Sequence, residues 1–211
     1  GGSANTISRT AFIIKTSYIM KKYILLLSLV VIAIGWTACS ETSNGPGCRI
    51  KGYLPFKEYK KVYLTDNSEN RIDSCEVKDG RFYLEEKGNI SEPYVAIIHM
   101  TAEQDSTDQL DMPVAIENGT IKVELGEYIK LSGTPLNTRI KEFLDALQHC
   151  KDGVVSKTDI TPEEISEIFS QFYKQQILSN KGNAVGEYIY RNYGVHLNTD
   201  DNKQVKAQMG N

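Results

Sequence analysis

Four cysteines have the clearest chemical potential in this 211-residue chain: Cys39, Cys48, Cys75 and Cys150. None belongs to a CxxC pair or to another spacing typical of metal ligands. A reactive thiol needs a helix N-terminus or a neighbouring cation to lower its pKa. Cys75 alternates in step with Val77, which predicts a small core residue in a strand. A disulfide between Cys48 and Cys75 is the alternative, because it would staple the sheet in an oxidising compartment.

Cys39 ends the stretch MKKYILLLSLVVIAIGWTAC, which begins at Met20. Two lysines precede an apolar run of about a dozen residues, whereas a membrane-spanning helix needs about 20. Small residues stand just before the cysteine, as a lipoprotein signal peptidase requires. The stretch resembles a bacterial lipoprotein signal, although Trp36 stands where an aliphatic residue is usual. The resemblance implies that Cys39 carries the lipid, and an ordinary signal peptide or uncleaved anchor is the alternative.

The first part of the chain is therefore expected to contain three segments. Residues 1–19 precede the first methionine and are expected to be a non-native or over-extended leader. Residues 20–38 are the expected signal peptide, and residues 39–47 are the expected lipidated tether. The residue after Cys39 is not an aspartate, which favours the outer membrane of a bacterial cell envelope over the inner one.

His149 and Cys150 raise the question of a base beside a nucleophile. Adjacent residues of a helix point about 100° apart, so the two side chains do not face each other. A histidine in the last turn of a helix is explained by the helix dipole. The sequence contains no GxSxG, HExxH, P-loop or dinucleotide fingerprint, and we expect no catalytic residue in it.

Carboxylates and histidines give no metal-site pattern either. Asp105, Asp108 and Asp111 lie in one acidic loop, but their spacing is not that of an EF-hand and the central glycine is missing. His99 and His196 are far apart, so we expect no metal and no cofactor. The chain has 24 basic and 27 acidic side chains and a net charge of −3, which gives no electrostatic footprint for nucleic acid.

Two kinds of element must position these residues. Residues 48–133 alternate with period two, which predicts an antiparallel β-sandwich or open barrel of about eight short strands. Asp79-Gly80 and Asn118-Gly119 each tolerate positive φ angles, so both predict type I′ hairpin turns.

Residues 134–211 change to a helical period and predict three to four helices, giving an α+β fold. Thr134-Pro135 and the capping box at Thr161 are expected helix starts. Thr199 opens a further helix, and Gly210 is its expected C-cap. A helix so close to the end of the chain indicates that the helical region is truncated.

Five segments follow one another in the chain: VYLTD, RIDSCEVKDGRFYLE, PYVAII, MPVAIENGTIKVEL and LSGTPLNTRIKEFL. In this order they resemble a domain of unknown function from bacterial envelope lipoproteins. In that family the domain usually precedes a thioredoxin-like domain of the peroxiredoxin-related, thiol-specific antioxidant type. This chain contains no WCxxC motif, so no redox residue is transferred to it. The family motif residues, which we expect to be structural, are Asp73, Ser74, Asp79, Gly80, Phe82, Glu117, Asn118, Gly119, Gly133, Thr134, Pro135 and Asn137.

The resemblance implies a membrane-tethered, non-catalytic accessory or recognition module of an envelope thiol–disulfide oxidoreductase lipoprotein. The thioredoxin-like domain itself is missing from this chain. A membrane held through the N-terminal lipid and an envelope protein are the implied partners, and the sequence predicts no oligomeric state. The alternative is a stand-alone envelope lipoprotein whose β domain binds a glycan or a peptide.

Overall fold

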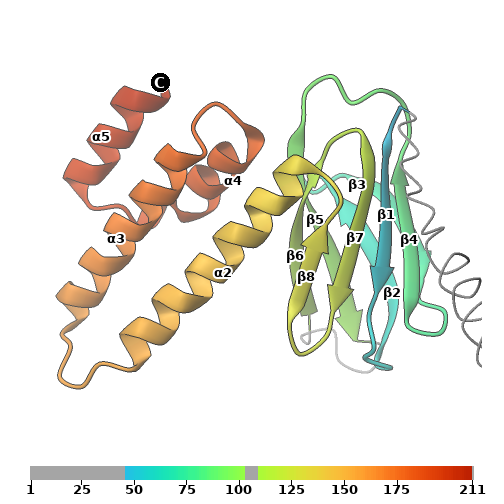
Figure 1. Ribbon diagram of the computed structural model, residues 1–211, viewed down its shortest axis with the longest axis horizontal. Helices are drawn as coiled ribbons and strands as arrows, with labels where there is room; N and C mark the ends of the chain where they lie inside the picture. The colour runs from blue at the N-terminus through green and yellow to red at the C-terminus, as the bar shows by residue number, and fades with distance from the viewer. Residues whose placement is uncertain (1–45, 103–108, 211) are drawn as a thin grey trace, which may run out of the picture. The chain divides into compact units, whose positions relative to one another are not determined.

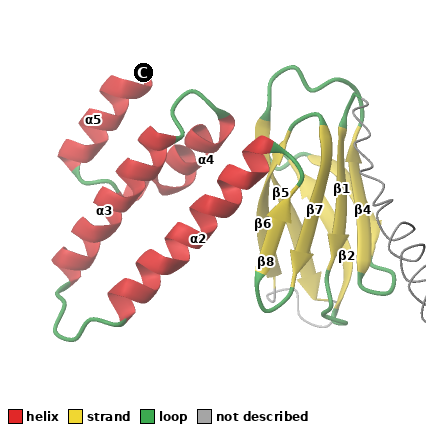
Figure 2. Cartoon of the chain, viewed as in Figure 1, coloured by secondary structure: helices red, strands yellow, loops and turns green. Residues whose placement is uncertain are grey.

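The fold is that of a computed structural model, which describes residues 46–102 and 109–210. Eight strands form two sheets, and helices follow them in the chain (Figure 1, Figure 2). This is the expected α+β fold, and the strands do not close into a barrel. The leader, the signal peptide and Cys39 lie outside the described residues, as do Asp105 and Asp108.

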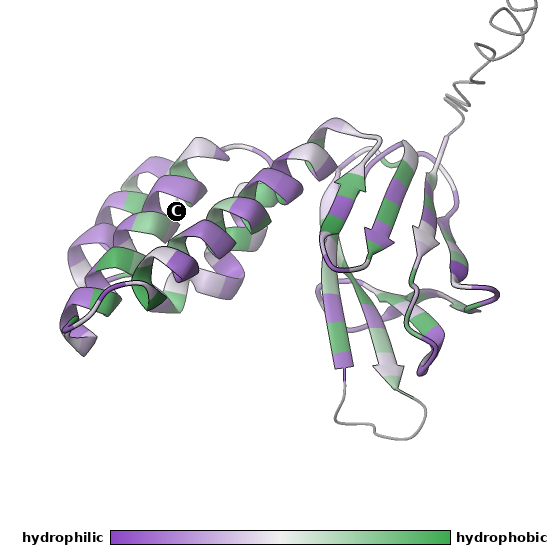
Figure 3. Cartoon of the chain, turned by 60° about the horizontal axis from the view of Figure 1, so that its bottom comes forward, coloured by the Kyte–Doolittle hydropathy of each residue, from purple (hydrophilic) through white to green (hydrophobic). Residues whose placement is uncertain are grey.

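Each sheet contains four strands. The first, which we call sheet A, has the order β4 (Arg81–Glu86), β1 (Cys48–Tyr53), β7 (Gly119–Leu125) and β8 (Ile129–Ser132). The second, sheet B, has the order β3 (Arg71–Glu76), β2 (Tyr59–Thr65), β5 (Tyr94–Ala102) and β6 (Gln109–Ile116). Apolar and polar residues alternate along β1, β4 and β7, whereas β5 and β6 contain consecutive apolar residues (Figure 3). The inward apolar side chains fill the space between the sheets.

One strand pair departs from the antiparallel expectation. Strands β1 and β7 run parallel, with Cys48 opposite Gly119 and Tyr53 opposite Glu124. The other strand pairs of the two sheets are antiparallel. A period of two places side chains on alternate faces in either orientation, so the pattern could not reveal this pair.

The hairpin expected at Asn118-Gly119 is wrong. Strand β6 belongs to sheet B and β7 to sheet A, so the dipeptide carries the chain from one sheet to the other. A type I′ turn needs positive φ at both central residues, and here Gly119 alone of the two has it, at 137°. The local preference of the dipeptide was overridden by the long-range pairing of β7 with β1.

At Asp79-Gly80 the expected tight turn forms, but the expected hairpin between two strands of one sheet does not. The two residues have φ angles of 51° and 72°, and the flanking Lys78 and Arg81 exchange two backbone hydrogen bonds of 2.9 Å. The strands on either side nevertheless enter different sheets, β3 in sheet B and β4 in sheet A. The turn therefore joins the two layers at one edge of the sandwich.

Four α-helices follow the sheets: α2 (Pro135–Val155), α3 (Pro162–Ser179), α4 (Ala184–Tyr193) and α5 (Thr199–Met209). A 3₁₀ turn, Gly194–His196, connects the last two. The expected starts are confirmed, because Thr134 is the N-cap of α2, and Thr161 forms both hydrogen bonds of the capping box with Glu164. Gly210 is a left-handed C-cap, as expected. None of the helices in the described residues is long and apolar enough to cross a membrane.

The prediction that His149 lies in the last turn of its helix is wrong. Helix α2 continues to Val155, so His149 lies before the last turn and not near the free carbonyl groups. The sequence after Cys150, KDGVV, contains Gly153, and glycine is a poor helix former. Gly153 is nevertheless accommodated inside the helix, at a cost of about 1 kcal/mol relative to alanine.

Helix α4 contacts β5 on the side of sheet B that faces away from sheet A, and helix α2 contacts β6 of sheet B and β8 of sheet A. Val95 and Ala115 point to this outer side, and both are buried there. The outer side of sheet A differs, because its two tyrosines, Tyr53 and Tyr83, are 46% and 45% exposed. The sandwich thus has one face in contact with helices and one face exposed.

Candidate binding pocket

The family motif residues lie at the joints between elements. Asp73 of β3 is the first: its carboxylate accepts hydrogen bonds from the N–H groups of Ser74, at 2.7 Å, and of Glu85 in β4, at 2.8 Å. The second bond ties the two edge strands that the Asp79-Gly80 turn connects. Phe82 lies in β4 beside this joint, and its side chain is buried in the core.

Asn118, the residue before β7, forms a second joint, which holds the chain at the start of strand β1. Its Oδ1 accepts from the N–H groups of Gly47, at 2.9 Å, and Ile90, at 3.1 Å. Its Nδ2 donates to the carbonyl of Ile90 at 2.9 Å and to Oδ1 of Asn89 at 3.1 Å. One amide side chain therefore holds three stretches of backbone together.

The third joint attaches helix α2 to the sandwich. Glu117 accepts a 2.7 Å hydrogen bond from the N–H of Leu136, which places a negative charge at the helix N-terminus. Asn137 is fully buried and bonds both backbone groups of Ala115, accepting at 3.0 Å and donating at 2.7 Å. Gly133 has φ of 113°, and a Cβ there would lie 2.1 Å from the carbonyl oxygen of Thr120.

The three cysteines among the described residues are free thiols. Burial raises the pKa of Cys48 to about 11, and a hydrogen bond from the backbone of Glu117 offsets it only in part. Burial likewise raises the pKa of Cys75 and of Cys150. A raised pKa disfavours the thiolate, so these thiols have the environment of structural cysteines rather than reactive ones.

Cys48 and Cys75, considered above as a disulfide pair, are both free thiols in the structure and lie in different sheets. Cys48 is paired with Glu86 of β4, whereas Cys75 comes from the other sheet and hydrogen-bonds the backbone of Tyr83.

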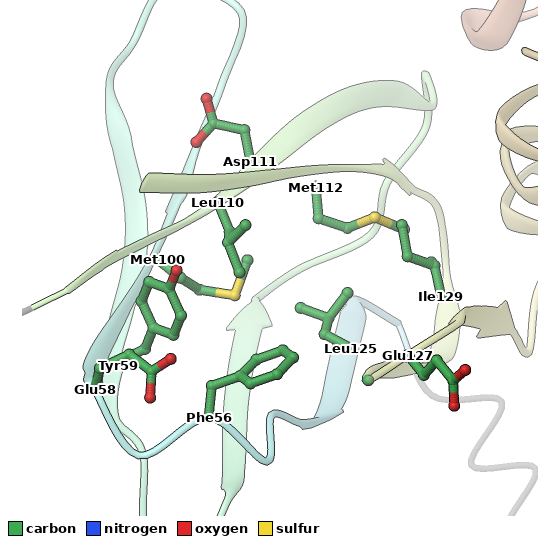
Figure 4. Close-up of a pocket in the computed structure, with 11 residues that line it drawn as sticks. Phe56, Glu58, Tyr59, Met100, Leu110, Asp111, Met112, Leu125, Glu127 and Ile129 are labelled. Carbon is green, nitrogen blue, oxygen red and sulfur yellow. The ribbon is translucent and has the colours of Figure 1, made fainter. Parts of the chain in front are cut away.

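An apolar pocket of about 440 Å³ opens between the sheets, at the end where β1 and β7 finish. The loop after β1 supplies one wall, and the turn between β7 and β8 supplies another. Strands β5 and β6 supply the floor with Met100 and Met112, which are buried. Figure 4 shows the side chains of Phe56, Leu110 and Leu125 converging on this space.

The walls of the pocket remain partly open to solvent. Phe56 and Leu110 are each 37% exposed, and Ile129 is 39% exposed. Large apolar side chains left exposed around one concavity are typical of a binding site rather than of a folded core. The pocket volume falls within the range of small-ligand sites, about 300–1,000 Å³.

Three carboxylates stand at the rim, those of Glu58, Asp111 and Glu127. In Figure 4 the carboxylate of Asp111 points away from the apolar side chains that converge beside it. Among the described residues, no lysine or arginine lines this pocket. The ligand that fits this pocket best therefore carries an apolar group beside a positive charge.

Asp111 also belongs to a hydrogen-bonded chain across the outer side of sheet B. Thr65 Oγ1 lies 2.8 Å from Nε2 of His99, and His99 Nδ1 lies 2.7 Å from Oδ1 of Asp111. The three residues come from the neighbouring strands β2, β5 and β6. Burial raises the pKa of Tyr188 in α4, and the carboxylate of Asp111 adds to that rise, so α4 lies close by.

The order hydroxyl, imidazole and carboxylate is also that of a hydrolase triad. A triad acts on a substrate held beside its hydroxyl, with donors aimed at the developing oxyanion. The pocket is lined by Asp111, but by neither Thr65 nor His99. The geometry is therefore that of a cross-strand polar network, which stabilises the sheet. Asp111 is bound to His99 here, and in residues 46–102 and 109–210 no group of side chains has a metal-binding arrangement.

Sequence reasoning missed the pocket residues, although one signal for them was present. Leu110 continues the inward alternation of Met112, Val114 and Ile116 along β6. An inward-pointing leucine at the end of a strand, beyond the packed core, indicates an open apolar site. Phe56 follows the end of β1, and its approach to β6 depends on the folding of the two sheets.

The fold and its site define a two-sheet β domain that is followed by helices and has an apolar pocket at one end. Residues 48–140 match a family model described as "Domain of unknown function (DUF4369)". All the family motif residues, from Asp73 to Asn137, lie within the matched range. The match thus covers the sandwich and the start of α2. No curated protein matches the chain.

Proposed function

We propose that this chain is a membrane-tethered, non-catalytic recognition module of a bacterial envelope lipoprotein, and that the apolar pocket is its recognition site. The observation that carries the proposal is the pocket itself. It is the place where large apolar side chains, Phe56, Leu110 and Ile129, are left partly exposed around a cavity. A binding site requires such an unfilled apolar surface, whereas a core does not.

The chemistry of the other candidate residues supports a non-catalytic role. The described thiols have raised pKa values, and the family motif residues are used in the joints between elements. A thioredoxin-like domain in the same lipoprotein would supply thiol–disulfide chemistry. The present chain would then position that domain and bind its partner.

The proposed tether is a lipid on Cys39. Each buried CH₂ contributes about 0.8 kcal/mol, so one acyl chain binds a membrane only marginally and two or three hold firmly. With a lipid there, residues 39–47 become a short link between the bilayer and strand β1. The proposed location is the envelope, at the outer membrane.

A second candidate is a stand-alone lipoprotein that binds a peptide or a glycan. The apolar walls and acidic rim of the pocket favour a peptide side chain, because sugar hydroxyls would find few partners among Met100, Met112 and Leu125. Reading the coding sequence beyond Asn211 separates the two candidates. A thioredoxin-like stretch there supports the redox lipoprotein, and an immediate stop codon contradicts it.

Recognition by the pocket is tested with two short peptides of opposite charge, acetyl-Lys-Phe-Lys-amide and acetyl-Glu-Phe-Glu-amide. We expect the cationic peptide to shift the NMR signals of Phe56, Leu110 and Ile129, and the anionic peptide to bind at least about tenfold more weakly. Leu110→Lys should abolish the shifts. Val155→Lys, at an exposed position of α2, is the matched control and should leave them unchanged. Equal binding of both peptides, or none, would refute the proposed site.

The tether is tested by labelling cells with radioactive palmitate. We expect label in the wild-type protein, none in Cys39→Ala, and normal labelling in Cys150→Ala. Persistent label in Cys39→Ala would show that the lipid is attached elsewhere.

A further inference from the structure

The outer side of sheet A is rich in basic side chains, which an exposed sheet face does not need for folding. We call it the basic face and define it by the outward side chains of its four strands. They alternate with the buried residues of β1, β4, β7 and β8. They are Arg49, Lys51, Tyr53, Arg81, Tyr83, Glu85, Thr120, Lys122, Glu124, Lys130 and Ser132.

The charge of this face is opposite to that of the chain. It has five basic and two acidic side chains, an excess of three positive charges, whereas the whole chain has a net charge of −3. Each glutamate already has a basic neighbour on the face: Glu85 lies 3.8 Å from Arg49, and Glu124 lies 2.6 Å from Lys130. Arg81 and Lys122 add positive charge to the face beyond these two pairs.

Two lysines of the basic face lie side by side. Lys51 of β1 is directly opposite Lys122 of β7 in the sheet register. Neighbouring strands are about 4.8 Å apart, and like charges opposite each other destabilise a sheet. Two lysines so close together raise the positive potential of the face, which attracts an anionic surface.

The tyrosines complete the pattern. Tyr83 is opposite Lys51, and Tyr53 is opposite Arg81, so aromatic and basic side chains alternate across β1 and β4. Tyr53 and Tyr83 are nearly half exposed. Tyrosine rings favour the interface between water and lipid, and long basic side chains reach phosphate groups from there.

We propose that the basic face lies against an anionic phospholipid surface. This rests on the proposed lipid at Cys39 for its proximity to a bilayer. From Cys39 to Pro46, where the description of the chain begins, a fully extended link spans at most about 25 Å. Strand β1 begins two residues later and belongs to sheet A. Contact on this face leaves the pocket, at the opposite end of β1, open along the membrane.

The experiment uses the full acylated chain on vesicles of phosphatidylcholine alone, or with about one third phosphatidylglycerol. Exposed lysines are acetylated with a water-soluble reagent, and the rate at each lysine is measured by mass spectrometry. We expect the rate at Lys122 to fall at least about threefold on the anionic vesicles only. Salt at about 0.5 M should restore the rate, because it shortens the range of electrostatic attraction to a few ångströms.

The control position is Lys181, which is exposed and lies between α3 and α4. Its rate should be the same on both kinds of vesicle. The double variant Arg81→Glu, Lys122→Glu removes the charge of the face, and the protection of Lys51 should be lost with it. The matched variant Lys181→Glu, Lys206→Glu makes the same charge change in the helical region and should retain the protection.

The outcomes distinguish this proposal from the proposed function. Protein that fails to float with either vesicle contradicts the lipid tether. Protein that floats but shows equal rates at Lys122 on both vesicles overturns the basic face as a docking surface. Protection at Lys181 in place of Lys122 also overturns it. Protection of Lys122 by a soluble sulfated polysaccharide, with none on vesicles, overturns it in favour of an anionic glycan.

Discussion

Asn137 shows how one side chain can stand in for a β-strand. Strand β6 is at an edge of sheet B, so the outward N–H and C=O groups of Ala115 have no neighbouring strand. The amide of Asn137 provides one acceptor and one donor, and it bonds both groups from the first turn of α2. An amide side chain is suited to this place because it carries both functions at one end.

Replacing Asn137 with alanine should therefore be costly. The change leaves two buried backbone groups without partners, and each costs about 1–3 kcal/mol, so we expect about 2–4 kcal/mol of lost stability. Urea denaturation followed by circular dichroism measures it. Gln148→Ala, at an exposed position of the same helix, is the control and should cost well under 1 kcal/mol. A loss as small as that of the control would show that water replaces the amide at Ala115.

The dual use of Asp111 is a second point at the residue scale. One carboxylate accepts from His99 and also stands at the rim of the pocket. The polar network on sheet B and the apolar pocket are thereby linked through a single side chain. A ligand cation near Asp111 would compete with His99 for the same oxygen atoms.

At the scale of elements, helix α5 is held by one buried carboxylate. The side chain of Asp201 is 3% exposed, and Lys174 and Ser170 of α3 each donate to it at 2.6 Å. Burial raises the pKa of Asp201, but these hydrogen bonds outweigh burial and hold the pKa below its usual value. The docking of α5 on α3 therefore depends on the ionised form.

The pH dependence of this docking follows from the lowered pKa. An unfolded aspartate has a pKa of about 3.9, so the stabilisation is complete above that pH and is lost as the pH falls through the lower folded pKa. Asp201→Asn should reduce stability by about 1–3 kcal/mol at neutral pH, and the difference from wild type should shrink below about pH 4. Denaturation at several pH values measures this.

Asp200→Asn is the control, since the side chain of Asp200 is 85% exposed and its carboxylate lies 3.6 Å from Nζ of Lys203. We expect it to change stability little at any pH. A pH-independent difference for Asp201→Asn would contradict the role of the charge and assign the effect to packing alone.

The elements differ in how far the sequence predicts them. The capping box at Thr161 and the Asp79-Gly80 turn were predicted correctly, because their signals act between residues close in the chain. Asn118-Gly119 was misread, because the choice between a hairpin and a crossing depends on the partner of β7. Similarly, the pocket is formed by Phe56, Leu110 and Ile129 from separate strands or loops, and no local pattern brings them together.

At the scale of the whole molecule, the described residues, which begin at Pro46, belong to one compact unit. The tether is proposed at the start of β1, the pocket opens at the other end of that strand, and the basic face lies on the side of sheet A away from sheet B. Helices α2 and α4 contact sheet B. Each surface thus has a separate part in the proposed function.

This arrangement predicts that sandwich and helices unfold together. The joints at Glu117 and Asn137 fix α2 to the sandwich, and Val95 and Ala115 are buried on the side of sheet B that contacts α4. Native-state hydrogen exchange should give the same opening free energy for amides in β5 and in α4, within about 0.5 kcal/mol. Asn137→Ala should lower the value for α4 more than that for β5, because it releases the helices from the sheet. If α4 in the wild-type protein opened well below β5, the helices would be a separate folding unit and the joints would contribute little to holding it.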